Sequence, residues 1–157
     1  MITWTDGGDV DSRGVAASGR STKVSITDLS GGVDDDLGPL IDKLGELLSD
    51  GGCAVVVRNT VRRVLRTAQA LRETYGDEVS VAHSRFIAAD RLRIDARLLD
   101  LFGPPGRCTQ RPQRHIVVAS QVVEQSLDVD FDLLVTDLAP IDLMLQRMGR
   151  LHRHDRG

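Results

Sequence analysis

The stretch CAVVVRNTVRRVLRTAQAL, residues 53–71, joins two different apolar patterns and decides the fold class. Its first part, CAVVVR (53–58), is a continuous apolar run, which is typical of a strand buried on both faces of a parallel sheet. Apolar residues then recur at intervals of three, four and three, at Val61, Val64, Ala68 and Leu71. This is the spacing of one helical face. The stretch therefore predicts a buried parallel strand followed directly by an amphipathic helix.

The same alternation continues on both sides of this unit. Further apolar runs predict strands at 79–83, 115–120 and 132–137. Helical spacing predicts helices over 37–48, over 92–102 and from about 142 towards 150. A polar loop is expected at 104–114. Strands that alternate with helices indicate a three-layer α/β domain with a mainly parallel sheet.

The first 32 residues differ from the rest of the chain. Residues 1–20 are rich in Gly, Ser and Asp and show no periodicity, so we interpret 1–32 as a flexible arm or linker remnant. Within it, KVSIT (23–27) can form a short edge strand. The domain itself is expected over 33–157. The acids of its first turn, Asp34 to Asp36, are expected to cap a helix rather than bind a metal.

Composition limits the class of protein. The net charge of −3 excludes a wholly basic nucleic-acid surface, although a local basic patch remains open. Aromatic residues make up only 3%, which argues against a binder that stacks bases on aromatic rings. Cys53 and Cys108 form no metal-ligand motif, and we expect Cys53 to be a buried core thiol in a reducing cytoplasm. No stretch approaches the ~20 apolar residues of a membrane span.

Polar segments follow each of the four predicted core strands. They are NTV (59–61), AHSRF (82–86), SQVVEQSLDVD (120–130) and TDLAP (136–140). In open parallel sheets, ligands bind where the strands end at their carboxyl sides. These four segments are therefore the first prediction of where function lies.

The segment QRMGRLHRH (146–154) concentrates basic residues in an acidic chain. If the last helix continues through it, Gln146, Arg150 and Arg153 share one face, because they are four and three residues apart. Met144, Met148 and Leu151 would share the face that packs inward. Gly149 leaves room beside Arg150 for another backbone or a ligand. Two guanidinium groups fixed on a helix predict a phosphate clamp, although a solvated arginine-rich helix end is equally open.

These segments together resemble the motifs of superfamily 2 helicases. QRMGRLHRH resembles the sixth motif, Q-x-x-G-R-x-x-R, through Gln146, Gly149, Arg150 and Arg153. The other segments resemble the fourth motif region, the block after it and the fifth motif, and they are VVVRNTVRR (55–63), AHSRFIAADR (82–91) and VASQVVEQSLDVDFD (118–132). Their wording is most similar to the CRISPR-associated helicase–nuclease of type I systems. The resemblance covers about residues 50–154.

The resemblance implies that the chain is the second of two RecA-like motor domains, which completes an ATP site. Arg150 and Arg153 would reach the γ-phosphate, one of them as an arginine finger. Gln146 and Gly149 would support that site. Asp128 would lie near the ATP ribose or orient a motif arginine. ATP and Mg²⁺ would both be held mainly by a first motor domain that is absent from this chain.

The resemblance also implies a grip on the backbone of one nucleic-acid strand. Seven residues would take part: Asn59, Thr60, His83, Ser84, Arg85, Ser120 and Gln121. Ser120 stands where threonine is commoner in the family. Amide and hydroxyl groups position a strand without reading its sequence, which is compatible with an acidic chain.

The chain lacks the residues that hold nucleotide phosphates in such motors. It contains no Gly-Lys pair, so it has no P-loop. The run from Asp77 to Ser80 begins like a DExD/H box but ends in serine and enters a strand. No metal site is expected, since His152 and His154 would diverge on a helix and the doublet His154-Asp155 is solitary. We therefore expect no ATP hydrolysis by this chain alone, and expect it to be a fragment, a split subunit or a decayed gene.

The leading hypothesis is the second motor domain of an ATP-dependent DNA helicase that translocates on single-stranded DNA in CRISPR antiviral defence. Its expected partners are the first motor domain, a nuclease domain, single-stranded DNA and a CRISPR RNA-guided surveillance complex, with no membrane. EQSLDVDFD (124–132) disfavours an RNA helicase of the DEAD-box type. The alternative is a non-catalytic nucleic-acid-binding module or a decayed helicase remnant.

Overall fold

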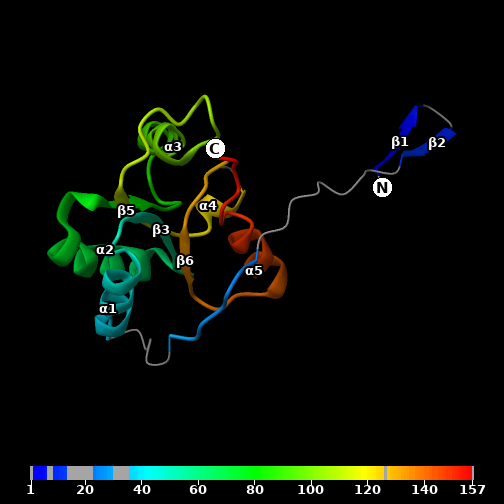
Figure 1. The fold of residues 1–157 in the computed structure, drawn as a ribbon. Coiled ribbons are helices and arrows are strands. Elements are labelled where there is room, and N and C mark those ends of the chain that lie inside the picture. Colours follow the sequence, from blue (N-terminus) through cyan, green and yellow to red (C-terminus); the bar gives the residue numbers. More distant parts are fainter. Residues whose placement is uncertain (1, 7–8, 14–22, 30–35, 126, 157) are drawn as a thin grey trace.

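The computed structural model describes residues 2–6, 9–13, 23–29, 36–125 and 127–156. The strands of its main sheet are β3 (Gly52–Val57), β4 (Val79–Ala82), β5 (Arg114–Ala119) and β6 (Leu133–Thr136). The helices are α1 (Gly38–Leu47), α2 (Val61–Tyr75), α3 (Ala88–Phe102), α4 (Val122–Gln125) and α5 (Ile141–Met148), with a short 3-10 helix η1 (Gly76–Glu78). The sheet has the order β4-β5-β3-β6, and every neighbouring pair is parallel (Figure 1).

Two separate hydrophobic clusters lie on opposite faces of the sheet. Alternate residues of β3 point to opposite sides, since Val55 belongs to one cluster and Val56 to the other. Leucines and valines of α1 and α2 cover one face. Leu98 and Phe102 of α3, together with residues after β5, cover the other face. The prediction of a three-layer α/β domain with a parallel sheet is therefore confirmed.

Local signals fix the starts of α1 and α2. The hydroxyl of Thr60 accepts a hydrogen bond from the backbone N–H of Arg63 at 3.3 Å, so it caps α2. Asp36 accepts one from the N–H of Gly38 at 2.9 Å, but the N-cap of α1 is Leu37, which makes no side-chain cap, so the predicted N-cap role of Asp36 is wrong. Asp34 and Asp35 lie outside the described residues. Because α2 starts directly after β3, its capping residue stands at the carboxyl end of the sheet.

The amino-terminal part differs from the sequence prediction. Residues 23–27 form no strand, and Ile26 is exposed, because no sheet edge lies against them among the described residues. Instead, β1 (Ile2–Asp6) and β2 (Asp9–Arg13) pair antiparallel in a two-stranded sheet. The alternation of Ile2 and Trp4 with Thr3 and Thr5 is a strand signal that the sequence analysis overlooked. The boundary between an arm and the domain at residue 32 stays a prediction.

No helix in the described part of the chain combines the length and apolar character needed to cross a bilayer. The longest helices, α2 and α3, have 15 residues each and carry several charges. Their apolar residues face the sheet rather than surrounding the helix.

His115 in β5 makes the stability of the fold depend on pH. It is buried, and its Nε2 lies 2.7 Å from the hydroxyl of Ser80 in β4. Burial, and after it the charge of Arg97, lower the pKa of His115. The unfolded chain therefore binds the proton more readily than the folded one, so stability should fall as pH decreases below about 6.5.

Urea unfolding at pH 7.5 and pH 5.5 measures this effect. We expect the free energy of unfolding to be lower at pH 5.5, and the difference to shrink in His115→Gln, whose amide can still bond Ser80. An equal pH dependence in the two proteins would contradict a role for His115.

Candidate nucleotide and nucleic-acid interface

The carboxyl ends of the four parallel strands form one continuous edge. Backbone hydrogen bonds continue across the strand ends, from Arg58 N–H to the Ala119 carbonyl at 2.8 Å and from Ser120 N–H to the Ala82 carbonyl at 3.0 Å. The N–H of Asp137 likewise bonds the Val57 carbonyl at 3.0 Å. The segments that follow the strands therefore lie next to one another, as the sequence predicted.

All seven residues that were predicted to contact a nucleic-acid strand lie along this edge of the sheet, but they differ in exposure. The exposed ones are Asn59, Thr60, Ser84, Arg85 and Gln121. His83 is buried and stacks on Phe86 with ring centroids 3.9 Å apart, while its Nδ1 accepts from the Arg85 N–H. Ser120 is also buried, and its hydroxyl has no partner among the described residues. Contact of His83 or Ser120 with a nucleic-acid strand therefore stays a prediction. It would require the residues that cover these two side chains to move.

Asn59 is exposed, but its polar atoms already have partners within the chain. Its Nδ2 donates to the Leu138 carbonyl at 2.8 Å, and its Oδ1 accepts from Nη2 of Arg147 at 3.2 Å. Its backbone N–H bonds the Asp137 carboxylate at 2.8 Å. Arg63 also pairs with Asp137 at 2.9 Å. Asn59 is thus the point where the loop after β3 is tied to the loop after β6.

A buried ion pair, which the sequence analysis missed, connects α5 with α4. Nε of Arg147 lies 2.7 Å from Oε1 of Glu124, and the two side chains are only 3% and 1% exposed. Nη1 of Arg147 also donates to the Thr136 hydroxyl at 2.6 Å and to the Asp137 carbonyl at 2.9 Å. One guanidinium group therefore joins α5, α4, the end of β6 and the loop after β3. The sequence did contain a signal for this ion pair, because Arg147 lies beside Met144 and Met148 on the face of the helix that was predicted to pack inward.

The predicted helical face of Gln146, Arg150 and Arg153 is wrong, because α5 ends at Met148. Gly149 takes the position after the helix with φ −64°, and an added Cβ would lie 3.3 Å from the Gln146 carbonyl oxygen. The absent side chain of Gly149 thus allows a close contact with its own helix. It does not open the predicted space beside Arg150. After it, Leu151 pairs with Phe131, and His152 has a positive φ of 45°. The positions of Arg150 and Arg153 are therefore set by the backbone bridge between Leu151 and Phe131, and not by helical spacing.

The two arginines nevertheless lie against the same segment of the chain. Nη2 of Arg150 donates to the Glu124 carbonyl at 2.5 Å, while its buried Nε has no partner among the described residues. Nε of Arg153 lies 2.5 Å from Oδ1 of Asp128, and both side chains are about half exposed. Burial, and after it the charge of Arg153, lower the pKa of Arg150. Both guanidinium groups thus contact α4 or the residues that follow it. Gln146 is exposed on α5.

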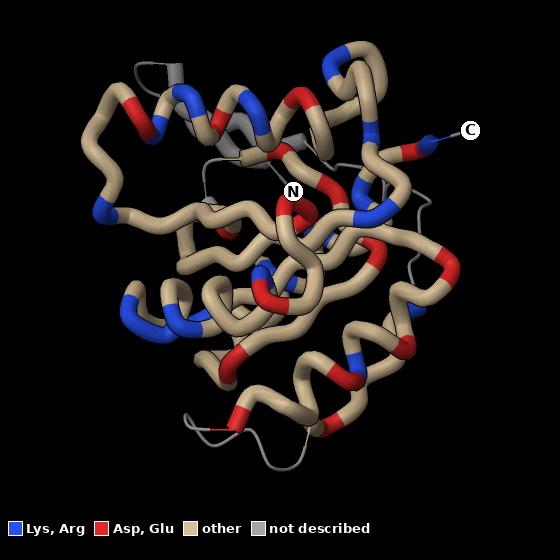
Figure 2. The backbone as a smooth tube through the Cα atoms, turned by 90° about the vertical axis from the view of Figure 1, so that its left-hand side faces the viewer, with Lys and Arg blue, Asp and Glu red and all other residues tan. Residues whose placement is uncertain are grey.

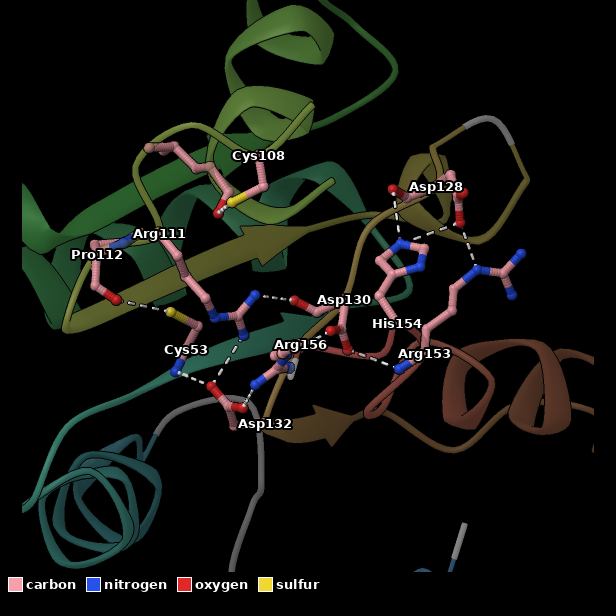
Figure 3. A network of polar contacts seen from close by, with 11 residues as sticks. Cys53, Cys108, Arg111, Pro112, Asp128, Asp130, Asp132, Arg153, His154 and Arg156 are labelled. Atoms are coloured by element: carbon pink, nitrogen blue, oxygen red, sulfur yellow. Dashed lines mark hydrogen bonds and ion pairs between the residues drawn. The ribbon is translucent and has the colours of Figure 1, made fainter. Parts of the chain in front are cut away.

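Alternating acids hold the segment that carries Arg153. Asp130 is almost fully buried and accepts from the backbone N–H of Arg153 at 2.7 Å and from Nε of Arg156 at 2.6 Å. Asp132 bonds the Cys53 N–H at 2.7 Å, Arg111 at 3.0 Å and Arg156. Figure 3 shows these side chains converging between the start of β3 and the last residues of the chain. Burial alone would raise the pKa of Asp130, but the hydrogen bonds from Arg156 and Arg153 lower it overall.

The two cysteines give no sign of chemistry. Both thiols are free, and Cys53 is buried against the Pro112 carbonyl at 3.4 Å. Burial raises the pKa of the Cys53 thiol to about 11, so it stays protonated at neutral pH. The expectation of a core thiol is confirmed. In the described part of the chain, no three His, Cys, Asp or Glu residues gather as metal ligands.

An open parallel sheet with helices on both faces, with its polar segments after the strand ends and an arginine segment beside them, defines a RecA-like domain. A family model described as CRISPR-associated nuclease/helicase Cas3, C-terminal, matches residues 50–156. The chain belongs to this family.

Individual relatives agree with this assignment. The CRISPR-associated nuclease/helicase Cas3 of Streptococcus thermophilus is 45% identical over 116 residues, which are 73% of this chain and 12% of that protein. The CRISPR-associated endonuclease/helicase Cas3 of Thermus thermophilus is 58% identical over 83 residues, covering 53% of this chain and 9% of that protein. The chain therefore spans a small part of the curated relatives that it matches.

Solved structures support the same fold. The crystal structure of T. fusca Cas3 with ATP matches with a TM-score of 0.72 and 34% identity, over 94% of this chain and 18% of that chain. The C-terminal domain of the DEAD-box protein Dbp5 matches with a TM-score of 0.52 and 20% identity, over 74% of this chain and 70% of that chain. The second likeness concerns the fold alone.

Proposed function

We propose that the chain is the second motor domain of an ATP-dependent DNA helicase that translocates on single-stranded DNA in CRISPR antiviral defence. The observation that carries this proposal is the segment from Ser120 to Phe131, which connects two groups of residues. At its start it lies on the carboxyl edge of the sheet, where the preceding Ala119 bonds Arg58, and further along it holds Arg150 and Arg153. One segment therefore touches the proposed DNA grip and the proposed ATP-site arginines.

The ATP site would be completed by Arg150 and Arg153. The ion pair between Arg153 and Asp128 is about half exposed, and such pairs contribute only about 0–1 kcal/mol. The triphosphate of ATP could therefore replace Asp128 as the partner of Arg153 at small cost. Asp128 then serves to orient the arginine before ATP arrives, which is one of its two predicted roles. Gln146, exposed on α5, would support the same site.

The chain contains no P-loop lysine and no DExD/H box, so the phosphate cradle and the Mg²⁺ ligands would come from a first motor domain. The structure of T. fusca Cas3 with ATP concerns a relative that binds this nucleotide. A further matching structure is titled CRISPR RNA-guided surveillance complex, pre-nicking. On this basis we infer that a nuclease domain and such a complex are the further partners of the chain.

The decisive experiment mixes this chain with a first RecA-like motor domain that carries a P-loop and a DExH box. We expect ATP hydrolysis that rises on addition of single-stranded DNA and is absent from either domain alone. Single-stranded DNA binding without any gain in hydrolysis would favour the alternative, a non-catalytic nucleic-acid-binding module.

DNA binding by the chain itself depends on a few local contacts. In the view of Figure 2, positions of Lys and Arg are interspersed with positions of Asp and Glu along the backbone. Arg85, exposed in the loop after β4, would contact a phosphate. Arg85→Ala should weaken binding to oligothymidine and lower the slope of log K against log[salt] by about 1.

Fluorescence titration over a range of salt concentrations measures both quantities. Arg72→Ala is the matched control. Arg72 lies in the last turn of α2, at the end of that helix away from Thr60 and the proposed DNA contacts. Its removal takes away the same charge and should leave the slope unchanged. Equal slopes for Arg85→Ala and the unmodified chain would contradict the proposed strand contact.

A further inference from the structure

Arg147 lies between the two groups of residues in the proposed function, which are the proposed DNA contacts and the proposed ATP-site arginines. Its Nη2 holds the side chain of Asn59 on the strand edge, and its Nε holds the carboxylate of Glu124. The backbone carbonyl of Glu124 in turn accepts from Arg150. A chain of three direct contacts therefore runs from Asn59 through Arg147 and Glu124 to Arg150.

A buried arginine is a poor choice for stability alone. A buried ion pair can often be replaced by apolar side chains of similar volume without loss of stability. Arg147 also offers a planar fork of donors that reaches several partners at once, which lysine could not do. Its four contacts lie on three other segments of the fold, which are α4, the end of β6 and the loop after β3, so the group fixes their positions relative to α5.

Two buried atoms in this network are left without partners among the described residues. They are Oε2 of Glu124 and Nε of Arg150, on residues that already touch at the Glu124 carbonyl. Unsatisfied buried polar groups are rare in native structures, and each calls for an explanation. A state in which Glu124 turns towards Arg150 would satisfy both atoms. Coupling between two sites requires a second arrangement of this kind.

We propose that Arg147 is a positioning residue that couples the state of Asn59 on the DNA edge to the placement of Arg150. This inference rests on the proposed function. When a DNA strand engages Asn59, the contact with Arg147 changes, Glu124 is redistributed between Arg147 and Arg150, and the Arg150 guanidinium moves. Arg147 itself touches neither DNA nor ATP.

The test uses the 157-residue chain and NMR signals of arginine Nε–H groups. Saturating oligothymidine should shift the Arg150 signal in the unmodified chain. The shift should be lost in the double variant Glu124→Leu with Arg147→Met, which replaces the buried pair by apolar side chains and is expected to fold. It should also be lost in Arg147→Lys, which keeps the charge but not the fork. Urea unfolding confirms that each variant is folded.

Three results would overturn the inference in distinguishable ways. If the unmodified chain binds oligothymidine but its Arg150 signal does not move, the coupling is absent while the DNA grip stands. If the shift persists in a folded double variant or in Arg147→Lys, Arg147 has a structural role only. If the unmodified chain does not bind oligothymidine, the proposed function fails together with the inference. Arg72→Met, an exposed replacement of the same type, should leave the shift intact.

Discussion

Arg150→Ala is expected to lower DNA-stimulated ATP hydrolysis about a thousandfold when the chain is combined with a first motor domain. The reason is that a guanidinium group stabilises charge on the γ-phosphate as it is transferred, and a thousandfold effect corresponds to about 4 kcal/mol. Half-buried Arg150, with its unpartnered Nε, can supply this charge without first breaking an ion pair. Steady-state hydrolysis with saturating DNA and ATP measures the effect on kcat.

Comparison with two other variants makes this prediction specific. Arg153→Ala should also reduce hydrolysis, because Arg153 neighbours Arg150, whereas Arg72→Ala should leave it unchanged. Arg150→Lys should recover little, since lysine provides a point charge instead of a planar fork. Undiminished hydrolysis in Arg150→Ala would rule out Arg150 as the arginine finger.

Phe131→Ala is expected to lower the free energy of unfolding by about 3–5 kcal/mol. Phe131 is fully buried, and its ring lies 5.1 Å from that of Phe102 between centroids. Its backbone also bonds Arg150 and His152, at 2.9 Å and 3.0 Å. The cavity left by alanine would therefore weaken both the core beneath α3 and the support of the arginine segment. Urea unfolding of the chain measures the loss.

The control is Leu92→Ala on α3, where the side chain is 70% exposed. This substitution should change stability by no more than about 0.5 kcal/mol. A loss below about 1 kcal/mol in Phe131→Ala would show that the site collapses around the smaller side chain, contrary to this expectation.

The sheet could be predicted from the sequence because its central strands are buried on both faces. The run 53–58 has no polar alternation, and the structure pairs it on both sides with β5 and β6. The helices were predicted because Val64, Ala68 and Leu71 keep the spacing of one buried face. The strand edge followed from this order, since parallel strands bring their carboxyl ends together.

The arginine network could not be predicted because its contacts depend on distant residues. Arg147 and Glu124 are far apart in sequence, and periodicity says nothing about which charge a buried arginine meets. The end of α5 was also missed, since the acids that hold the following segment, Asp130 and Asp132, precede it by some twenty residues. The prediction extended the helical spacing past Gly149. It therefore assigned Arg153 to a helical face that does not exist.

The order of the strands also sets the order in which the chain can fold during synthesis. The central strand β3 finds neither of its neighbours before β5 and β6 have been made, because Gly52 pairs with Arg114 and Ala54 with Leu133. Until then its five buried residues emerge from the ribosome without a partner, and such exposed apolar strands are prone to aggregate. The nascent chain should thus require chaperone protection between the emergence of β3 and that of β5.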